Sequence, residues 1–262
     1  MSRLVPSNRF FHVFRKIPEF ELLPGPTVTF ISEVDLTEIE QLRQAAAEQK
    51  PSYTAFVIKA LALALREFPY ANQRICRRAW VPFAKARLQR FEHCDIAVAA
   101  ERDVDGVESA AFVDIARDAN EKTLTEITKW LRELSKSDAT TNQQWQEFST
   151  VIERFPGWLA LFLIRLPYLV PRLWERYRGA AAMVTSPAKY GVDTVAACWS
   201  WPVGVSFGLV KERPVVKDGQ IKACPTFNLI CNFDRRIMAG AQAGRFFATI
   251  VKNLEAAKST LA

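Results

Sequence analysis

An aspartate and two arginines stand together at the end of a predicted strand, where their side chains could bind an anion. Asp234 ends the strand predicted at 226–234, and Arg235 and Arg236 lie between it and a predicted helix that begins at Gly240. A guanidinium stays protonated at neutral pH because its pKa lies above about 12. It pairs well with carboxylates and phosphates and stabilises developing negative charge. The turn is therefore suited to anion binding, and Arg235 cannot act as a general base.

Histidine and cysteine offer little further chemistry in this chain. The only histidines are His12 and His93, and no zinc-ligand spacing is present, so we expect no metal. The cysteines are odd in number and include no Cys-x-x-Cys pair; they are Cys76, Cys94, Cys198, Cys224 and Cys231. We therefore expect buried free thiols in a reducing compartment, which favours a cytoplasmic location.

The composition is that of a globular protein, and its charge is unevenly spread. Hydrophobic residues make up 49% of the 262 residues and charged residues 24%, which argues against disorder and fits one large domain. The formal net charge is +7, and the stretch 154–178, with five arginines and one glutamate, supplies +4 of it. The remaining charge is too small for a nucleic-acid-binding stripe, so we expect no nucleic-acid partner.

Residue periodicity predicts the elements that must position these residues. Apolar residues alternate with polar ones in 226–234, as in a strand with one buried face, whereas they go nearly all round a buried helix at 52–68. Asp35 and Glu38, three residues apart, predict a capping box at the start of the helix expected from Leu36. The expected helices are 36–49, 52–68, 124–134 and 240–257, and the expected strands are 27–34, 94–101, 107–115, 183–186, 203–210 and 226–234. Hairpins mixed with helices predict an α/β two-layer sandwich, with a mixed β-sheet covered by helices.

The segment Asn232–Phe247 resembles the C-terminal signature of dihydrolipoamide acyltransferases, the catalytic domains of 2-oxoacid dehydrogenase complexes. The family signature reads roughly S-[FY]-D-H-R-x-x-D-G-A-x-A-A-R-F, and this chain reads NFDRRIMAGAQAGRFF. The segments Thr27–Arg43, Ser52–Ile75 and Met183–Val210 are similar to further stretches of the same catalytic domain. The resemblance implies a single acyltransferase-like domain over 1–262, with a fold like that of chloramphenicol acetyltransferase.

In this family a histidine deprotonates the thiol of coenzyme A or dihydrolipoamide, and the thiolate attacks an acyl thioester. The resemblance puts Arg235 at the histidine position and Ala239 at the position of a family Asp or Asn. It puts Thr185 at the hydroxyl that stabilises the oxyanion, and Asp234 matches a family aspartate. Four further residues are expected to contact the substrate, namely Ser186, Glu108, Ser109 and Asn232.

The missing histidine leaves several functions open. General-base assistance contributes about 10²–10⁴-fold in rate, and Arg235 cannot supply it. Acyl transfer between CoA, or another pantetheine thioester, and an unknown acceptor survives if the thiol ionises unaided, with Arg235 and Thr185 stabilising negative charge. Alternatively, the chain is an inactive pseudoenzyme that binds acyl-CoA or acts as a scaffold. Neither His12 nor His93 is expected to replace the base.

An apolar and basic helical insertion, at about 137–180, departs from the family pattern. Its core, Phe155–Arg178, is too short and too often broken by proline to span a membrane. The expected surface has a basic and an opposite apolar face, formed by Arg165, Arg172 and Arg176 and by Leu159, Phe162 and Leu166. This segment has three alternative roles. It is buried against the domain or a neighbouring subunit, it binds to an anionic membrane surface or a protein partner, or it forms a lid over an acyl chain.

The resemblance also implies partners and cofactors. In this family the histidine of one subunit meets the channel of the next, so we expect a homotrimer. We expect coenzyme A as the acyl carrier and no lipoyl group on this chain, because no lipoyl module fits upstream of Thr27; the chain then resembles a stand-alone homologue. The basic N-terminal arm shows no secretory signal and is expected to dock, with an organellar transit peptide as the alternative.

Overall fold

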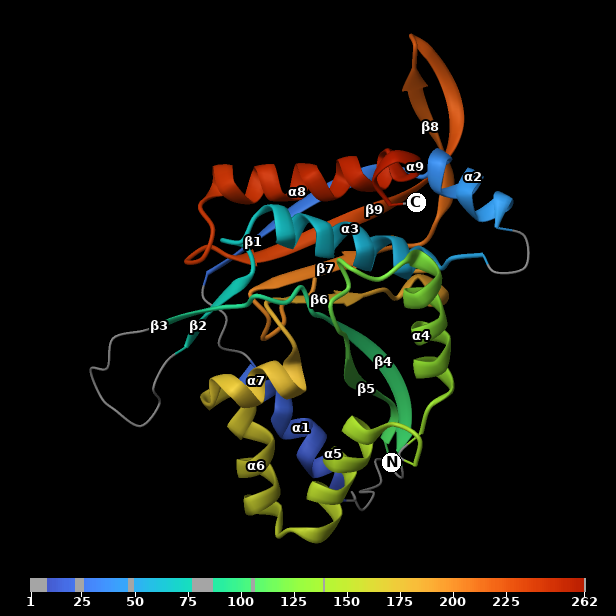
Figure 1. Cartoon of the computed structure of the whole chain (residues 1–262). Helices are drawn as coiled ribbons and strands as arrows, with labels where there is room; N and C mark the ends of the chain where they lie inside the picture. Colours follow the sequence, from blue (N-terminus) through green and yellow to red (C-terminus); the bar gives the residue numbers. More distant parts are fainter. Residues whose placement is uncertain are drawn as a thin grey trace, which may run out of the picture.

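Within the part of the chain that the structure describes, seven strands form one mixed sheet (Figure 1). The computed structural model describes residues 9–21, 26–46, 50–76, 87–104, 107–138 and 140–261. The strand order is β1-β9-β7-β6-β4-β5, and β8 pairs with β9. The strands are β1 (Thr27–Asp35), β4 (Ile96–Val104), β5 (Val107–Ala116), β6 (Ala182–Thr185), β7 (Val203–Phe207), β8 (Lys211–Lys217) and β9 (Gln220–Asp234). Because β4, β6 and β7 are parallel and the other pairs antiparallel, the predicted mixed sheet is confirmed.

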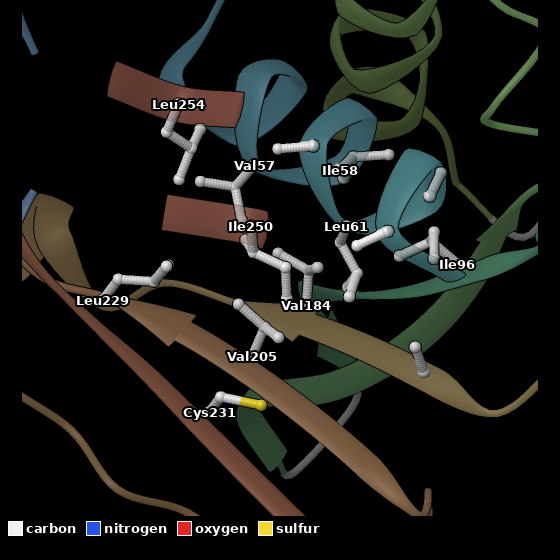
Figure 2. Packing of buried hydrophobic residues seen from close by; sticks show 14 of the residues in the cluster. Val57, Ile58, Leu61, Ile96, Val184, Val205, Leu229, Cys231, Ile250 and Leu254 are labelled. Atoms are coloured by element: carbon white, nitrogen blue, oxygen red, sulfur yellow. The ribbon is translucent and has the colours of Figure 1, made fainter. Parts of the chain in front are cut away.

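Helices α3 (Tyr53–Glu67) and α8 (Gly240–Glu255) cover one face of this sheet and form the main core with it (Figure 2). The apolar residues of α3 are buried all round, as its sequence predicts, and the Ser52 hydroxyl caps the helix by accepting the Ala55 N–H at 3.1 Å. The core residues include Val57, Ile58, Leu61, Ile250 and Leu254 from the helices and Val184, Val205 and Leu229 from the sheet. This layer of helices on a mixed sheet confirms the two-layer fold.

The remaining elements are helices and a separate two-stranded ribbon. The helices are α1 (Arg9–Glu21), α2 (Thr37–Ala45), α4 (Leu124–Lys136), α5 (Gln143–Arg154), α6 (Gly157–Leu169), α7 (Pro171–Arg178) and α9 (Ala257–Thr260), and β2 (Gln73–Cys76) pairs with β3 (Arg87–Arg90) in a separate ribbon. Helices α1, α5, α6 and α7 gather on one side of the molecule, below the sheet in Figure 1. Val13 of α1 packs with Ile152 and Ile164 there, so the N-terminal arm docks onto the insertion as a helix.

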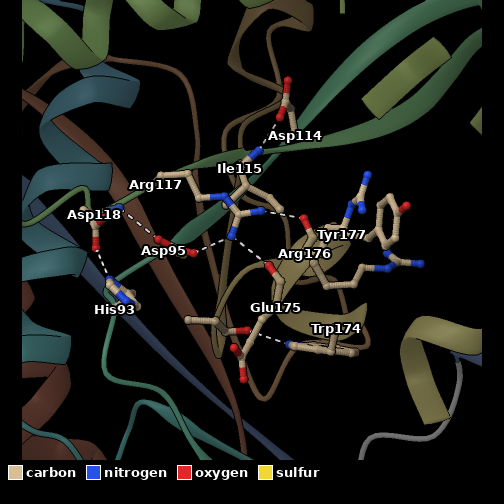
Figure 3. Close-up of polar contacts among 12 residues, drawn as sticks. His93, Asp95, Asp114, Ile115, Arg117, Asp118, Trp174, Glu175, Arg176 and Tyr177 are labelled. Atoms are coloured by element: carbon tan, nitrogen blue, oxygen red, sulfur yellow. Dashed lines mark hydrogen bonds and ion pairs between the residues drawn. The ribbon is translucent and has the colours of Figure 1, made fainter. Parts of the chain in front are cut away.

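Helix α7 is tied to the β4–β5 hairpin by one arginine (Figure 3). Arg117, just after β5, donates to the Asp95 carboxylate at 2.6 Å and to the backbone carbonyls of Glu175 at 2.7 Å and Arg176 at 2.5 Å. These carbonyls belong to the last turn of α7, where a cation complements both the free acceptors and the helix dipole. Trp174, which is fully buried, packs in one cluster with Met183 of the sheet. The insertion is therefore anchored to the sheet at its C-terminal end.

Two local predictions were wrong. A hairpin that was not predicted joins β8 to β9 through Asp218 and Gly219, both with positive φ (53° and 75°), so the last strand begins at Gln220. The capping box at Asp35 does not form: Asp35 accepts the Thr37 N–H at 2.9 Å, while Glu38 accepts the N–H of Lys258 at 2.9 Å. That N–H lies in the first turn of α9 and lacks an intrahelical acceptor, so it competes for the carboxylate. The end of the predicted helix 36–49 lies outside the described residues.

The predicted basic and apolar faces of the insertion also do not form. Val170 separates α6 from α7, and Pro171 stands at the start of α7, where its missing N–H costs nothing. Arg165 therefore lies on a different helix from the other two arginines. On α6 it shares an exposed face with Trp158 and Phe162, at spacings of seven and three residues, and these aromatics are 73% and 41% exposed. Among the described residues, no helix is long and apolar enough to cross a membrane.

Candidate functional site

A rigid turn follows β9 and presents Arg235. The carboxylate of Asp234, which is 5% exposed, accepts the backbone N–H of Arg236 at 2.9 Å and its guanidinium at 2.5 Å. The hydrogen bond to Asp234 raises the pKa of Arg236. The backbone N–H groups of Asp234 and Arg235 donate to the carbonyls of Pro202 and Pro26 at 2.8 and 2.9 Å. Asp234 is therefore a positioning residue for the turn.

The side chain of Arg235 is exposed at the tip of this turn. Within the described residues, no hydrogen bond or ion pair engages its guanidinium. A permanently charged group held on a fixed backbone, with its donors unoccupied, can bind a carboxylate or phosphate from outside the chain. The turn thus presents an exposed guanidinium, and Arg235 itself cannot accept a proton.

Ala239 stands at the start of α8, and its methyl group cannot accept a hydrogen bond. Its own N–H donates to the side-chain Oε1 of Gln242 at 3.0 Å. This is half of a capping box, because the reciprocal bond needs an acceptor on residue 239. The helix therefore begins without a side-chain N-cap at the position where the family resemblance implies Asp or Asn.

Thr185 and Ser186 differ in how their hydroxyls are used. Ser186 donates to the Phe207 carbonyl at 2.9 Å and accepts the Ala188 N–H at 3.3 Å, so it fixes the turn after β6. Thr185 is half-buried at the end of β6, and its hydroxyl has no hydrogen-bond partner among the residues described. Thr185 is thus available to donate to a ligand, whereas the Ser186 hydroxyl already has two protein partners.

The fold keeps Thr185 and Arg235 apart within one chain. Ser206 of β7 pairs with Thr185 on one side and with Ile230 of β9 on the other. Since β9 runs antiparallel to β7, Arg235 lies five residues beyond Ile230 towards the opposite end of the sheet from Thr185. Strand geometry makes this separation about 16 Å along the strands and about 10 Å across them. The two residues therefore meet only if two copies of the chain come together.

Asn232 holds the segment that covers the outer face of the sheet. Its side chain accepts from the Thr29 hydroxyl at 2.5 Å and donates to the Ala197 carbonyl at 2.9 Å. Ser206 donates to the Val195 carbonyl at 2.6 Å in the same way. These bonds use both polar ends of the Asn232 amide, so the geometry favours a positioning role over direct substrate contact. The side chains of the other predicted contacts, Glu108 and Ser109, lie outside the described part of β5.

A small cleft beside Asp234 contains residues that the sequence did not identify as site residues. Cys198, Trp199 and Trp201 line it. Cys198 is exposed, so the expectation that these cysteines are buried is wrong for this residue, because its segment lies over the sheet and not within a strand. Cys231, in contrast, is buried in β9, and burial raises its pKa to about 12.

The two histidines lie on different segments from Thr185. His93 precedes β4, at the same end of the sheet as Arg235 and three strand spacings away, which is about 14 Å. Its Nδ1 lies 2.6 Å from a carboxylate oxygen of Asp118 (Figure 3), and this hydrogen bond and the negative charge raise its pKa. His12 lies exposed on α1, in edge contact with Phe11. The imidazole of His93 thus has a carboxylate partner, and within one chain it lies towards the opposite end of the sheet from Thr185.

A protein-family model matches most of this chain. The model of the 2-oxoacid dehydrogenases acyltransferase (catalytic domain) matches residues 23–151 and 174–262. The unmatched residues 152–173 include all of α6.

The curated relatives that match this chain include acetyltransferase components of pyruvate dehydrogenase complexes. The dihydrolipoyllysine-residue acetyltransferase component of the pyruvate dehydrogenase complex of Bacillus subtilis is 26% identical over 232 residues, which cover 84% of this chain and 42% of the relative. The corresponding component of Rickettsia felis is 24% identical, over 97% of this chain and 53% of the relative. The chain thus spans about half the length of these relatives.

Solved structures show the same fold. The dihydrolipoamide acetyltransferase of Azotobacter vinelandii superposes with a TM-score of 0.71 at 19% identity and covers 100% of this chain and 95% of its own. That structure was determined to investigate a serine, a histidine and an asparagine in its catalytic mechanism. The truncated catalytic core of the 2-oxoacid dehydrogenase complex of Thermoplasma acidophilum superposes with a TM-score of 0.63 at 16% identity, covering 97% of this chain and 99% of its own.

Proposed function

The chain belongs to the family of 2-oxoacid dehydrogenase acyltransferase catalytic domains, and we propose that it binds a thioester of coenzyme A, or of another pantetheine carrier, at an altered acyl-transfer site. The observation that carries this proposal is the Thr185 hydroxyl, which has no hydrogen-bond partner in the described chain and which the sequence resemblance puts at the family's oxyanion position. A donor of this kind stabilises the negative oxygen that forms when a thiolate attacks a thioester.

The proposed chemistry runs without a general base. A thiol with a pKa near 8.5 is a few per cent ionised at neutral pH. Its thiolate attacks the thioester carbonyl, Thr185 donates to the oxyanion, and the carrier thiolate leaves as the carbonyl re-forms. Arg235 attracts the anionic thiolate or a phosphate of the carrier. Such transfer is expected to be slower by about 10²–10⁴-fold than with a positioned base.

The site is proposed to form between copies of the chain, in a homotrimer. The support is the separation of Thr185 and Arg235, which lie at opposite ends of the sheet and cannot contact one ligand atom within one chain. A head-to-tail contact brings one end of a subunit to the other end of its neighbour, and three such contacts close a ring.

Two assays separate this function from that of a pseudoenzyme, which would bind acyl-CoA without turning it over. Acyl exchange from acetyl-CoA to a small thiol and hydrolysis of acetyl-CoA are measured on the purified chain. We expect slow exchange that Arg235→His raises and Thr185→Ala removes, with Ser186→Ala as a neighbouring hydroxyl control. Binding of acetyl-CoA with no turnover in either the natural chain or Arg235→His would favour the pseudoenzyme, and no binding would overturn both.

A membrane-surface function is the second candidate, because α6 exposes Trp158 and Phe162 beside Arg165. Aromatic and basic residues on one helical face are typical of binding at an anionic bilayer surface. Flotation with vesicles containing phosphatidylserine tests this function. Binding that Trp158→Ser weakens would support it, and the absence of binding to such vesicles would remove it.

A further inference from the structure

A cavity of about 290 Å³ lies between the edge strand β5 and helices α1, α5, α6 and α7. Its walls are mainly aliphatic and aromatic; they include Phe112, Phe148, Val151, Leu163, Leu166 and Leu173. Helix α6, which forms one wall, lies entirely in the stretch that the family model does not match. The cavity is therefore a feature of this chain's insertion, separate from the residues compared with the family site.

The polar groups at this cavity already have protein partners. Gln144 donates to the carbonyls of Val113 at 3.2 Å and Tyr177 at 2.9 Å. Glu147 accepts from the Tyr177 hydroxyl and from Arg176, both at 2.7 Å. A bound water needs two to four polar partners, and these groups have few bonds left to offer. The cavity is thus better suited to an apolar guest than to water.

The cavity wall lies level with Thr185 on the same face of the sheet. Val113 pairs with Ala99, and the preceding residue of β4, Val98, pairs with Val184, the residue before Thr185. Val113 packs against the buried cluster that contains Met183. Thr185 points the same way as Met183 because side chains alternate along a strand. Two strand spacings, about 10 Å, separate Thr185 from Val113.

We propose that this cavity binds a linear apolar chain of about eight to ten carbons, such as a fatty acyl chain. A methylene group is similar in size to a water molecule, whose share of liquid volume is about 30 Å³, so the volume accommodates about ten carbons. The chain comes either from a thioester bound at Thr185 or from a free fatty acid. Only the first source rests on the proposed function.

A chain-length series tests the proposal. Binding of CoA, of acyl-CoA thioesters from four to fourteen carbons, and of free decanoate is measured by calorimetry on the full chain. Each methylene that enters the cavity should strengthen binding about fourfold. A thioester bound at Thr185 must first span the roughly 10 Å to Val113, so its affinity should rise only at chain lengths that reach the cavity. An affinity that rises along the thioester series identifies the thioester as the source of the apolar chain. Binding of decanoate without such a rise identifies the free acid as the source. The proposal is overturned if the affinity of the thioesters does not rise with chain length and decanoate does not bind.

Two matched variants place the binding in the cavity. Leu163→Trp fills the cavity from α6 and should weaken decanoyl binding about tenfold or more, because two or more methylenes lose their place. Leu159→Trp introduces the same side chain on the same helix outside the cavity lining and should leave binding unchanged. Equal effects of the two variants, or no effect of the first, would contradict the proposal.

Hydrogen exchange on the unmodified chain gives a reading that needs no variant. Saturating decanoate, or decanoyl-CoA, should slow exchange in the amides of α5 and α6. Protection confined to elements that do not line the cavity would overturn the assignment. Decanoate carries no CoA. If decanoate binds but CoA and its thioesters do not, the proposed function is refuted and the cavity proposal stands.

Discussion

Asp234 organises the turn that presents Arg235 by bonding to both the backbone and the guanidinium of Arg236. Replacing it with alanine leaves the Arg236 N–H without its acceptor. We expect Asp234→Ala to lower the free energy of unfolding by about 1–3 kcal/mol, measured by urea denaturation. Asp218→Asn is the matched control, since the Asp218 side chain is 92% exposed in its pair with Lys222 and its loss should cost less than about 1 kcal/mol. Equal effects would show that Asp234 does not brace the turn.

The His93–Asp118 pair predicts a pH dependence at the surface. Their hydrogen bond raises the pKa of His93 above the 6.5 of an unperturbed histidine. Because the folded-state pKa is the higher one, the stabilisation is fully present below pH 6.5 and is lost as the pH rises through the folded-state pKa. NMR titration of the His93 ring should give a midpoint above 6.5 that falls in Asp118→Asn. An unchanged midpoint in that variant would refute the pairing.

At the scale of elements, the start of α8 lacks the cap that most helices have. Asp at position 239 could accept the N–H of Gln242, which has no side-chain acceptor in the present sequence. We expect Ala239→Asp to raise the free energy of unfolding by about 0.5–2 kcal/mol. Ala241→Asp adds the same charge within the first turn without capping, so it should provide only the helix-dipole part, about 0.3–1 kcal/mol. Thermal denaturation compares the two, and a larger gain at 241 would argue against capping.

Strongly periodic elements were predictable, and elements defined by tertiary contacts were not. The buried helix α3 follows from its apolar pattern and the Ser52 cap. The β8–β9 hairpin had a signal in Asp218–Gly219, a pair typical of tight turns, but its strands are exposed and lack a clear apolar alternation; Val216 and Ile221 are 70% and 77% exposed. The faces of the insertion were mispredicted because residue spacing was counted across Val170 and Pro171, which divide two helices.

At the scale of the whole molecule, the sequence located candidate residues but not their relative positions. Thr185 and Arg235 are identified by the resemblance to the family's segments, whereas their placement at opposite ends of the sheet depends on strand order and direction. The cavity under the insertion is likewise formed by segments far apart in sequence, from Ile17 to Arg178. No local pattern encodes such long-range arrangements.

If the site forms between copies, two defective chains should restore each other. In a closed ring built by one repeated contact, each site takes Thr185 from one subunit and Arg235 from its neighbour. Random co-assembly of Thr185→Ala chains with Arg235→Glu chains should then leave about a quarter of the sites intact. Thioester binding, or exchange where present, should be recovered only in the mixture, at the mass of a trimer, about 89 kDa or three times 29.7 kDa. A mixture no better than the separate variants would mean that both residues do not serve one site between subunits. An equal mixture of the natural chain with the double variant tests for failed assembly, because random co-assembly leaves about a quarter of its sites intact and separate assembly about a half.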